Sequence, residues 1–264
     1  MSLVNIEPES LSNLKDKTEL INSFQGATTG IVAAVNRQLT DIGSKVVWGD
    51  VAEPPTRTRA SCGRNATSYN SVLDLFKTAL AAHGRIDRTV YSAGVAGPGE
   101  DGRLFDTVTA SPSSLIEEES STRVLDVNLR GALFFSRVTV HHLRKSLAAA
   151  KGREAFAVGK AKRMTTTPRS FSSAPAAASP GSPTQMISKF LDTFASRGLM
   201  CNEPEDVSRA ITHALASRAD GETYYVAGSK AYEIEKRLEA LRAQWLGEDV
   251  YRDLVVVQDV FAGA

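Results

Sequence analysis

A strand, a glycine-bearing turn, a helix and a second strand follow one another near the start of the chain. The apolar run KTELINSF (17–24) predicts the first strand, and QGATTG (25–30) predicts the turn. IVAAVNRQLTDIG (31–43) has apolar residues at helical spacing and ends at Gly43, a residue type that favours a helix end. SKVVWGDV (44–51) predicts the second strand. This unit constrains the fold to the class in which strands and helices alternate.

The same alternation continues along the chain. TSYNSVLDLFKTALAAHG (67–84) predicts an amphipathic helix that Thr67 or Ser68 can cap, and RIDRTVYSAG (85–94) predicts a strand that ends in a turn. Residues 121–147 predict a long helix whose middle is apolar. Strands and helices in this order indicate an α/β fold with a doubly wound parallel sheet of the Rossmann type, covered by helices on both faces.

The alternation fails in two segments. Residues 52–66 occupy the place of a third strand but are basic and contain proline. Residues 148–184 are rich in Ala, Ser, Thr, Pro and basic residues, which predicts a loop or a disordered segment where only EAFAVG (154–159) resembles a strand. Later runs predict helices over 185–198 and 203–217, a strand over 222–228, and one or two charged helices over 229–255.

Length and composition fit one domain. The chain has 264 residues and 42% hydrophobic composition, enough for a single large core, and its sequence contains no internal repeat. We therefore predict one Rossmann-like domain over residues 1–264. In this domain residues 148–184 are irregular and residues 229–264 form a helical extension.

The charge of the chain argues against nucleic acid or an anionic membrane as its partner, because the net charge is only +1. We expect a small-molecule partner instead. The two cysteines and four histidines lack metal-ligand spacing, so no metal site is predicted. Residues 1–17 contain no apolar signal core, and no apolar run is long enough to cross a bilayer, so a cytoplasmic protein is expected.

The glycine-bearing turn after the first predicted strand suits a dinucleotide. Gly26 and Gly30 bracket this turn, where side chains would keep a diphosphate from the backbone N–H groups of Gly30 and Ile31. Asp50 follows at the end of the second strand, where a carboxylate can accept hydrogen bonds from ribose hydroxyls. Val32 stands where a third glycine often allows close packing, so the alternative is that the glycines merely permit a tight turn.

Several stretches together resemble the short-chain dehydrogenase/reductase family. Besides the glycine-bearing turn they are VYSAGVAGPG (90–99), VLDVNLRGALFFSRVTVHHLRK (124–145), SPGSPTQM (179–186) and GETYYVAG (221–228). The resemblance covers residues 14–147 and about 179–230. It implies a nicotinamide coenzyme, a small-molecule substrate, and assembly into a dimer or tetramer through the long helix.

The resemblance also implies roles for individual residues. Ala93 and Gly94 match the turn beneath the coenzyme, with Tyr91 and Ser92 in place of the family's two asparagines. Asn128 matches the family's structural and catalytic asparagine. The remaining matches are Asn65, where the family usually has an aspartate at the adenine, and Pro180 and Gly181, in the turn beside the nicotinamide.

The family's catalytic Tyr-x-x-x-Lys pair is missing from its expected place, because residues 132–179 contain no tyrosine. Tyr232 and Lys236 have the required spacing but follow the last predicted strand, in a segment with the charge pattern of a solvated helix face. We therefore predict that this pair lies on a surface helix and takes no part in catalysis.

One branch of the family has lost the same pair. The chain is similar to the fungal bifunctional reductase/Diels–Alderases of bicyclic prenylated indole alkaloid biosynthesis, the malbrancheamide and paraherquamide type. This resemblance implies NADPH-dependent reduction of an iminium, which needs no proton donor, followed by an intramolecular [4+2] cycloaddition. Arg130 matches an arginine that this branch uses near the substrate, although the branch's Pro-Asp-Pro-Gly-Trp segment with its partner aspartate is absent here. Arg130 is equally compatible with a surface position.

Two other functions remain open from the sequence. One is a non-catalytic scaffold that keeps the fold, and the other is an ordinary carbonyl reductase with a different proton donor, for example Tyr91. The choice of coenzyme is also open. Asp50 favours NAD because a carboxylate repels a 2′-phosphate, whereas the alkaloid-branch resemblance favours NADP.

Overall fold

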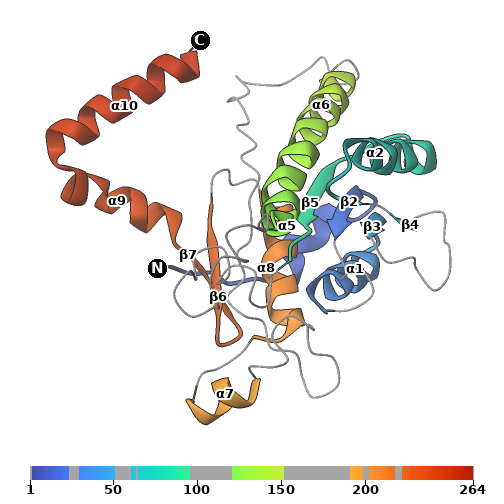
Figure 1. The fold of residues 1–264 in the computed structure, drawn as a ribbon, viewed down its shortest axis with the longest axis horizontal. Helices are drawn as coiled ribbons and strands as arrows, with labels where there is room; N and C mark the ends of the chain where they lie inside the picture. The colour runs from blue at the N-terminus through green and yellow to red at the C-terminus, as the bar shows by residue number, and fades with distance from the viewer. Residues whose placement is uncertain are drawn as a thin grey trace, which may run out of the picture.

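The computed structural model of the chain describes residues 2–23, 30–50, 61–63, 65–95, 121–151, 191–198, 202–217 and 222–263 (Figure 1). Within these residues it contains a four-stranded parallel sheet and a separate three-stranded antiparallel sheet. Helices pack on both faces of the parallel sheet.

The parallel sheet has the strand order β4-β3-β2-β5. Its strands are β2 (Thr18–Ser23), β3 (Lys45–Asp50), β4 (Ser61–Gly63) and β5 (Arg88–Ser92). Every residue of β2 is buried, as expected for the central strand of a sheet that is covered on both faces. The predicted α/β fold with a parallel sheet is thereby confirmed, and the third strand that residues 52–66 failed to predict is the short β4.

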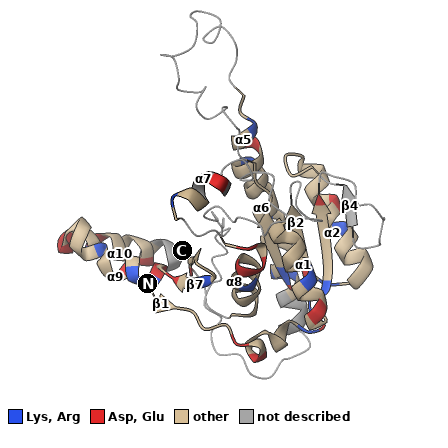
Figure 2. Cartoon of the chain, turned by 90° about the horizontal axis from the view of Figure 1, so that it is seen from below, with Lys and Arg blue, Asp and Glu red and all other residues tan. Residues whose placement is uncertain are grey.

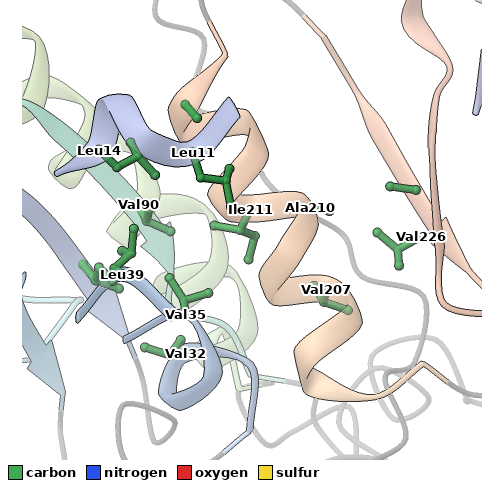
Figure 3. Close-up of a cluster of buried hydrophobic side chains, with 13 residues drawn as sticks. Leu11, Leu14, Val32, Val35, Leu39, Val90, Val207, Ala210, Ile211 and Val226 are labelled. Carbon is green, nitrogen blue, oxygen red and sulfur yellow. The ribbon is translucent and has the colours of Figure 1, made fainter. Parts of the chain in front are cut away.

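One face of this sheet is covered by η1 (Pro8–Leu14), α1 (Gly30–Ile42) and α8 (Pro204–Ala216). Helix α1 is followed by Gly43 at φ +91°, so the predicted glycine stop is confirmed. Figure 3 shows apolar side chains from α1, α8 and η1 meeting over the sheet. The buried residues of this cluster are Leu11, Leu14, Ile21, Val32, Val35, Leu39, Val90, Val207, Ala210, Ile211, Ala216, Val226 and Ala231.

The other face is covered by α2 (Tyr69–His83) and by a long helical stretch. This stretch begins as α5 (Arg123–Leu125), passes through the single π-helical turn η2 (Asp126–Arg130), and continues as α6 (Gly131–Lys151). Because α6 includes residues 148–151, the predicted start of the irregular segment at 148 is wrong. Residues 152–184 lie outside the described part of the chain. The buried residues on this face are Leu20, Val47, Val72, Leu75, Phe76, Ala79, Ile86, Phe135 and Val138.

The antiparallel sheet joins β1 (Ser2–Leu3), β7 (Lys230–Glu233) and β6 (Tyr224–Ala227) in that order. Strands β6 and β7 form a hairpin whose two-residue turn, Gly228–Ser229, has φ values of +56° and +63°. Positive φ at both positions suits the turn that matches the twist of paired strands. The predicted strand over 222–228 is confirmed, but the prediction that residues 229–255 begin as helix is wrong, because 230–233 form β7.

The remaining described helices are α7 (Leu191–Ser196), α9 (Glu235–Leu246) and α10 (Glu248–Gly263). Both views show α9 and α10 extending to one side of the parallel sheet (Figures 1 and 2). In the described part of the chain, no helix combines the length and the apolar character that a membrane span requires.

Candidate functional site

The carboxyl ends of β2, β3 and β5 lie side by side at one edge of the parallel sheet. Strand β2 is central, and the chain passes from it through α1 to β3 on one side and returns later to β5 on the other. The paired residues Asn22 and Gly49, and Ser23 and Ser92, bring these ends into register. Open parallel sheets bind ligands at such an edge, where the strand order reverses. The candidate site therefore lies at this edge.

Helix α1 begins at this edge with Gly30, which has a φ of +63° and is buried. A left-handed backbone at this position favours glycine over residues with a Cβ atom. The next residue, Ile31, packs its side chain against the core between α1 and α8, so only its backbone N–H is available at the helix start. Gly26, the other predicted glycine, lies outside the described residues.

Two polar side chains at the end of β2 are buried, and the sequence pattern did not predict a role for them. Asn22 and Ser23 are each 1% exposed, and Asn22 Oδ1 and Ser23 Oγ have no hydrogen-bond partner among the described residues. Successive strand residues point to opposite faces, so unpaired oxygens lie on both sides of β2 where it ends. Buried polar atoms normally have a partner, which makes this edge a candidate for a bound polar molecule. The pattern that could have identified them is Asn-Ser closing an otherwise apolar strand.

Asp50 ends β3 at the same edge and is 2% exposed. Asn65 lies in the loop between β4 and α2, where its side-chain oxygen accepts hydrogen bonds from Thr67 N at 2.9 Å and Thr67 Oγ1 at 2.8 Å. Ser68 then caps α2 by accepting a hydrogen bond from Ser71 N at 3.4 Å, so of the two predicted caps Ser68 is the one observed. Asn65 therefore also organises the loop that leads into α2.

The segment after β5 is fastened to the long helical stretch by Asn128. Its Nδ2 donates to Val95 O at 2.9 Å, and its Oδ1 accepts from Val95 N at 2.8 Å. Ala93 and Gly94 lie between β5 and this contact, and Ala93 is buried. The structure thus brings together the predicted residues Gly30, Asp50, Ala93, Gly94 and Asn128 around one edge, since each follows or contacts a strand end there. Pro180 and Gly181 lie outside the described residues.

The π-helical turn η2 carries both predicted catalytic residues, Asn128 and Arg130. Such turns leave backbone groups without their usual helical partners and occur often at functional sites. Here Tyr91 of β5 donates a hydrogen bond to Val127 O at 2.5 Å. Burial raises the pKa of Tyr91 above its ordinary value. A phenol that is engaged in this way and holds its proton more tightly is poorly suited as the alternative proton donor considered above.

Arg130 has an acidic neighbour within its own turn. Its Nη2 lies 3.3 Å from Asp126 Oδ1, at a spacing of four residues, and the Arg130 side chain is 52% exposed. The absence of the Pro-Asp-Pro-Gly-Trp segment predicts that Arg130 lacks a carboxylate partner. Asp126 supplies one instead. An ion pair this exposed contributes little to stability, so it is compatible with either a substrate-facing or a surface role.

Tyr232 and Lys236 do not share a helix. Tyr232 lies in β7, opposite Leu3 and Tyr225, whereas Lys236 lies in α9. Lys236 Nζ bonds to Glu222 Oε1 at 2.8 Å, and this hydrogen bond raises the pKa of Lys236. The predicted shared helix is wrong, because the hairpin turn at 228–229 pairs residues 230–233 with β6. The pair belongs to the antiparallel sheet and α9, away from the strand ends of the candidate site.

Replacing Asn128 with alanine is expected to destabilise the protein by about 1–2 kcal/mol, because both hydrogen bonds to Val95 are lost. Hydrogen exchange should accelerate at the Val95 amide. The matched control is Asn5→Ala, which removes an exposed asparagine that bonds only locally to Glu7. Unchanged protection of Val95 in the Asn128 variant would contradict this assignment.

Comparison with known proteins points to one family over about half of the chain. A short-chain dehydrogenase/reductase, ascJ from Acremonium egyptiacum, is 35% identical over 156 residues, which are 58% of this chain and 50% of the relative. Cis-4-hydroxycyclohexanecarboxylate dehydrogenase from Sinomonas cyclohexanicum is 31% identical over 144 residues, 51% of this chain and 52% of the relative. Half the chain is similar to short-chain dehydrogenases. The chain spans about half the length of the curated relatives it matches.

Solved structures support the fold. The match to the crystal structure of gox2181 covers 79% of this chain and 91% of the gox2181 chain, with a TM-score of 0.50 and 16% sequence identity. No family model matches the chain. The sequence matches support the resemblance to short-chain dehydrogenases/reductases, and the structural match extends the likeness of fold beyond the segment of sequence similarity.

Proposed function

We propose that the chain is a short-chain dehydrogenase-like oxidoreductase that binds a nicotinamide dinucleotide at the carboxyl edge of the parallel sheet. The observation that carries this proposal is the pair of buried oxygens of Asn22 and Ser23, which have no hydrogen-bond partner among the described residues, together with the left-handed backbone of Gly30 at the start of α1. A polar ligand there would satisfy atoms that are otherwise costly to bury. The sequence likeness to named dehydrogenases and reductases supports the choice of ligand.

Each residue at the edge then has a definite part in binding. The N–H groups of Gly30 and Ile31, at the start of α1, hold the diphosphate. Asp50 accepts hydrogen bonds from the adenosine ribose, and Asn65 lies nearest to the adenine. The bare backbone at Ala93 and Gly94, held in place by Asn128 through Val95, lies beneath the nicotinamide ring.

We further propose that the substrate is an iminium rather than a ketone. When bound, a reduced nicotinamide supplies a hydride. A ketone would also need a proton donor at its developing alkoxide, whereas an iminium carbon accepts hydride and becomes a neutral amine without one. Tyr91, the tyrosine of β5, is engaged with Val127 O, which favours the iminium. The resemblance to the fungal alkaloid branch adds an intramolecular cycloaddition, in which the Arg130 cation, balanced by Asp126, biases charge in the transition state.

Titration calorimetry with NADH and with NADPH tests the proposal. We expect saturable binding of at least one of them, with Asp50→Ala weakening NADH binding roughly tenfold or more through loss of charge-assisted hydrogen bonds. If the coenzyme is NADP, the same change should spare or improve NADPH binding, because a carboxylate repels the 2′-phosphate. Asp41→Ala, an exposed aspartate at the far end of α1, is the matched control.

A second measurement tests the chemistry. NADPH or NADH absorbance should fall when a cyclic iminium is added and should stay constant with a ketone of similar shape. The absence of any heat with either coenzyme would overturn the binding proposal. Binding with equal turnover of ketone and iminium would overturn only the substrate assignment.

A non-catalytic scaffold remains the second candidate because of Val32. This residue, in the place of the third glycine, is 4% exposed and packs into the core. A scaffold predicts that the folded protein binds neither coenzyme, so the same titration separates the two candidates.

A further inference from the structure

Tyr91, near the carboxyl end of β5, ties this strand to the π-helical turn η2. Its hydroxyl donates a hydrogen bond to Val127 O at 2.5 Å, and its ring packs against Phe135 of α6 with 5.5 Å between the ring centres. Helix α6 lies beside β5 (Figure 1). Burial raises the pKa of Tyr91, so the phenol keeps its proton and remains a hydrogen-bond donor at neutral pH. The strand and the turn are therefore joined by a contact that does not change with pH in the ordinary range.

The space around the Tyr91 hydroxyl leaves little room for adjustment. A Cβ atom added at Gly131 would lie 2.5 Å from this hydroxyl, which is closer than packed atoms approach one another. Gly131 directly follows η2, so the glycine leaves the space that the hydroxyl occupies. Because the hydroxyl is enclosed on this side and bonded to Val127 O on the other, it fixes where η2 lies against β5.

The next residue of η2 carries a second tie to the same part of the chain. Asn128 Nδ2 donates to Val95 O at 2.9 Å, and Asn128 Oδ1 accepts from Val95 N at 2.8 Å. Val127 and Asn128 are neighbours in the chain, and Tyr91 and Val95 are separated only by residues 92–94. We call these four tied residues the β5–η2 ring. The two ties together hold residues 92–94 at both ends.

The adenosine side of the candidate site is built from other elements. Gly30 begins α1, Asp50 ends β3, and Asn65 lies in the loop before α2. The β5–η2 ring instead encloses residues 92–94, which include the backbone assigned above to the nicotinamide. Loss of the contact between β5 and η2 should therefore affect the nicotinamide side of the site first.

We propose that Tyr91 is a positioning residue for the nicotinamide half of the coenzyme. Its hydrogen bond holds η2 in the place from which Asn128 binds Val95. The β5–η2 ring then presents a preformed backbone at residues 92–94, so that binding of the coenzyme does not have to order this segment. In this role Tyr91 acts through η2 and contacts neither coenzyme nor substrate. The role rests on the proposed function, because it concerns the same edge of the sheet.

Titration calorimetry of Tyr91→Phe with two ligands tests this role. The first ligand is whichever of NADH and NADPH the parent protein binds more tightly. The second is ADP-ribose, or its 2′-phosphate in the case of NADPH, which lacks the nicotinamide. We expect the variant to bind the coenzyme about fivefold more weakly, the effect of one lost hydrogen bond, and to bind the ADP-ribose ligand as the parent does. A general loss of structure would weaken the binding of both ligands alike.

Tyr69→Phe is the matched control. Tyr69 packs edge-on against Phe134 of α6 on the same face of the sheet, with 5.3 Å between the ring centres, but it belongs to α2 and not to the β5–η2 ring. This variant should bind both ligands as the parent does. Each substitution keeps the aromatic ring and removes one hydroxyl, and circular dichroism checks that both variants are folded before the titration.

Hydrogen exchange in the absence of coenzyme tests how the effect reaches residues 92–94. The Val95 amide should exchange faster in Tyr91→Phe than in the parent, because η2 is less firmly held, and should be unchanged in Tyr69→Phe. Equal exchange of Val95 in Tyr91→Phe and the parent would overturn the assigned route through Asn128.

The titration distinguishes failure of this role from failure of the proposed function. If the parent binds a coenzyme, equal coenzyme affinity in Tyr91→Phe, or equal weakening of coenzyme and ADP-ribose, overturns the role of Tyr91 and leaves the proposed function standing. A parent protein that binds neither coenzyme overturns the proposed function, and the role of Tyr91 with it.

Discussion

Gly131→Ala is expected to destabilise the protein by about 2–3 kcal/mol, although alanine is normally the better helix former. Gly131 begins α6 immediately after the π-helical turn. A Cβ atom there would lie 2.5 Å from the Tyr91 hydroxyl and 3.1 Å from Ala66 O. Backbone at Ala66 has little freedom to move, because Ala66 is 1% exposed. Urea unfolding followed by circular dichroism gives the change directly.

Tyr91→Phe provides the internal control for this prediction. By itself it removes the hydrogen bond to Val127 O and should cost about 1–2 kcal/mol. In the Tyr91→Phe background the hydroxyl is no longer present, so Gly131→Ala should cost clearly less than in the parent protein. If the unfolding free-energy costs of Tyr91→Phe and Gly131→Ala are simply additive, the Tyr91 hydroxyl is not the reason that position 131 requires glycine. A gain in stability from Gly131→Ala, as general helix propensity predicts, would refute the close approach altogether.

The second large effect concerns Glu19, a carboxyl group buried in the centre of the sheet. Its side chain is fully buried, Oε1 lies 3.4 Å from Arg88 Nη1, and Oε2 has no partner among the described residues. Burial, only partly offset by Arg88, raises the pKa of Glu19 to about 7. The native protein therefore holds a proton that the unfolded chain releases near pH 4.5. Stability is expected to fall by about 3 kcal/mol as the pH rises from 4.5 to 7, through this group alone.

Glu19→Gln removes this titration while keeping the shape of the side chain. The difference in unfolding free energy between the variant and the parent should shift by about 3 kcal/mol in favour of the variant between pH 5 and pH 8. Glu9→Gln, at an exposed carboxyl in η1, is the control and should show no such shift. A difference that stays constant across this range would mean that Glu19 is ionised in the native state at low pH.

The sequence predicted the parallel half of the fold well because its cues are local. β2, β3, α2 and β5 each fall within the predicted runs, and α1 begins one residue before its predicted run, at Gly30. The ends of these elements are marked by residues such as Gly43 and Ser68 that act on their own neighbours. The positions of Gly30 and Asp50 at one edge follow from the order of these elements. Local pattern is therefore sufficient for this part of the molecule.

Features that depend on distant pairing were missed. Strand β7 lies in a charged run that resembles a helix, and it becomes a strand because it pairs with β6 and with Ser2–Leu3 at the other end of the described chain. Asn22 and Ser23 have unremarkable residue types, and their importance comes from complete burial at a strand end. The family resemblance placed the acidic partner of Arg130 in a later segment. In the structure the acidic neighbour of Arg130 is Asp126, four residues earlier in the same helical stretch.

The π-helical turn is fixed to the central sheet at two places, through Tyr91 to Val127 and through Asn128 to Val95. Leu129 belongs to that same turn and is exposed. Displacement of this turn would require these hydrogen bonds to break, so we expect its backbone amides to exchange slowly with solvent.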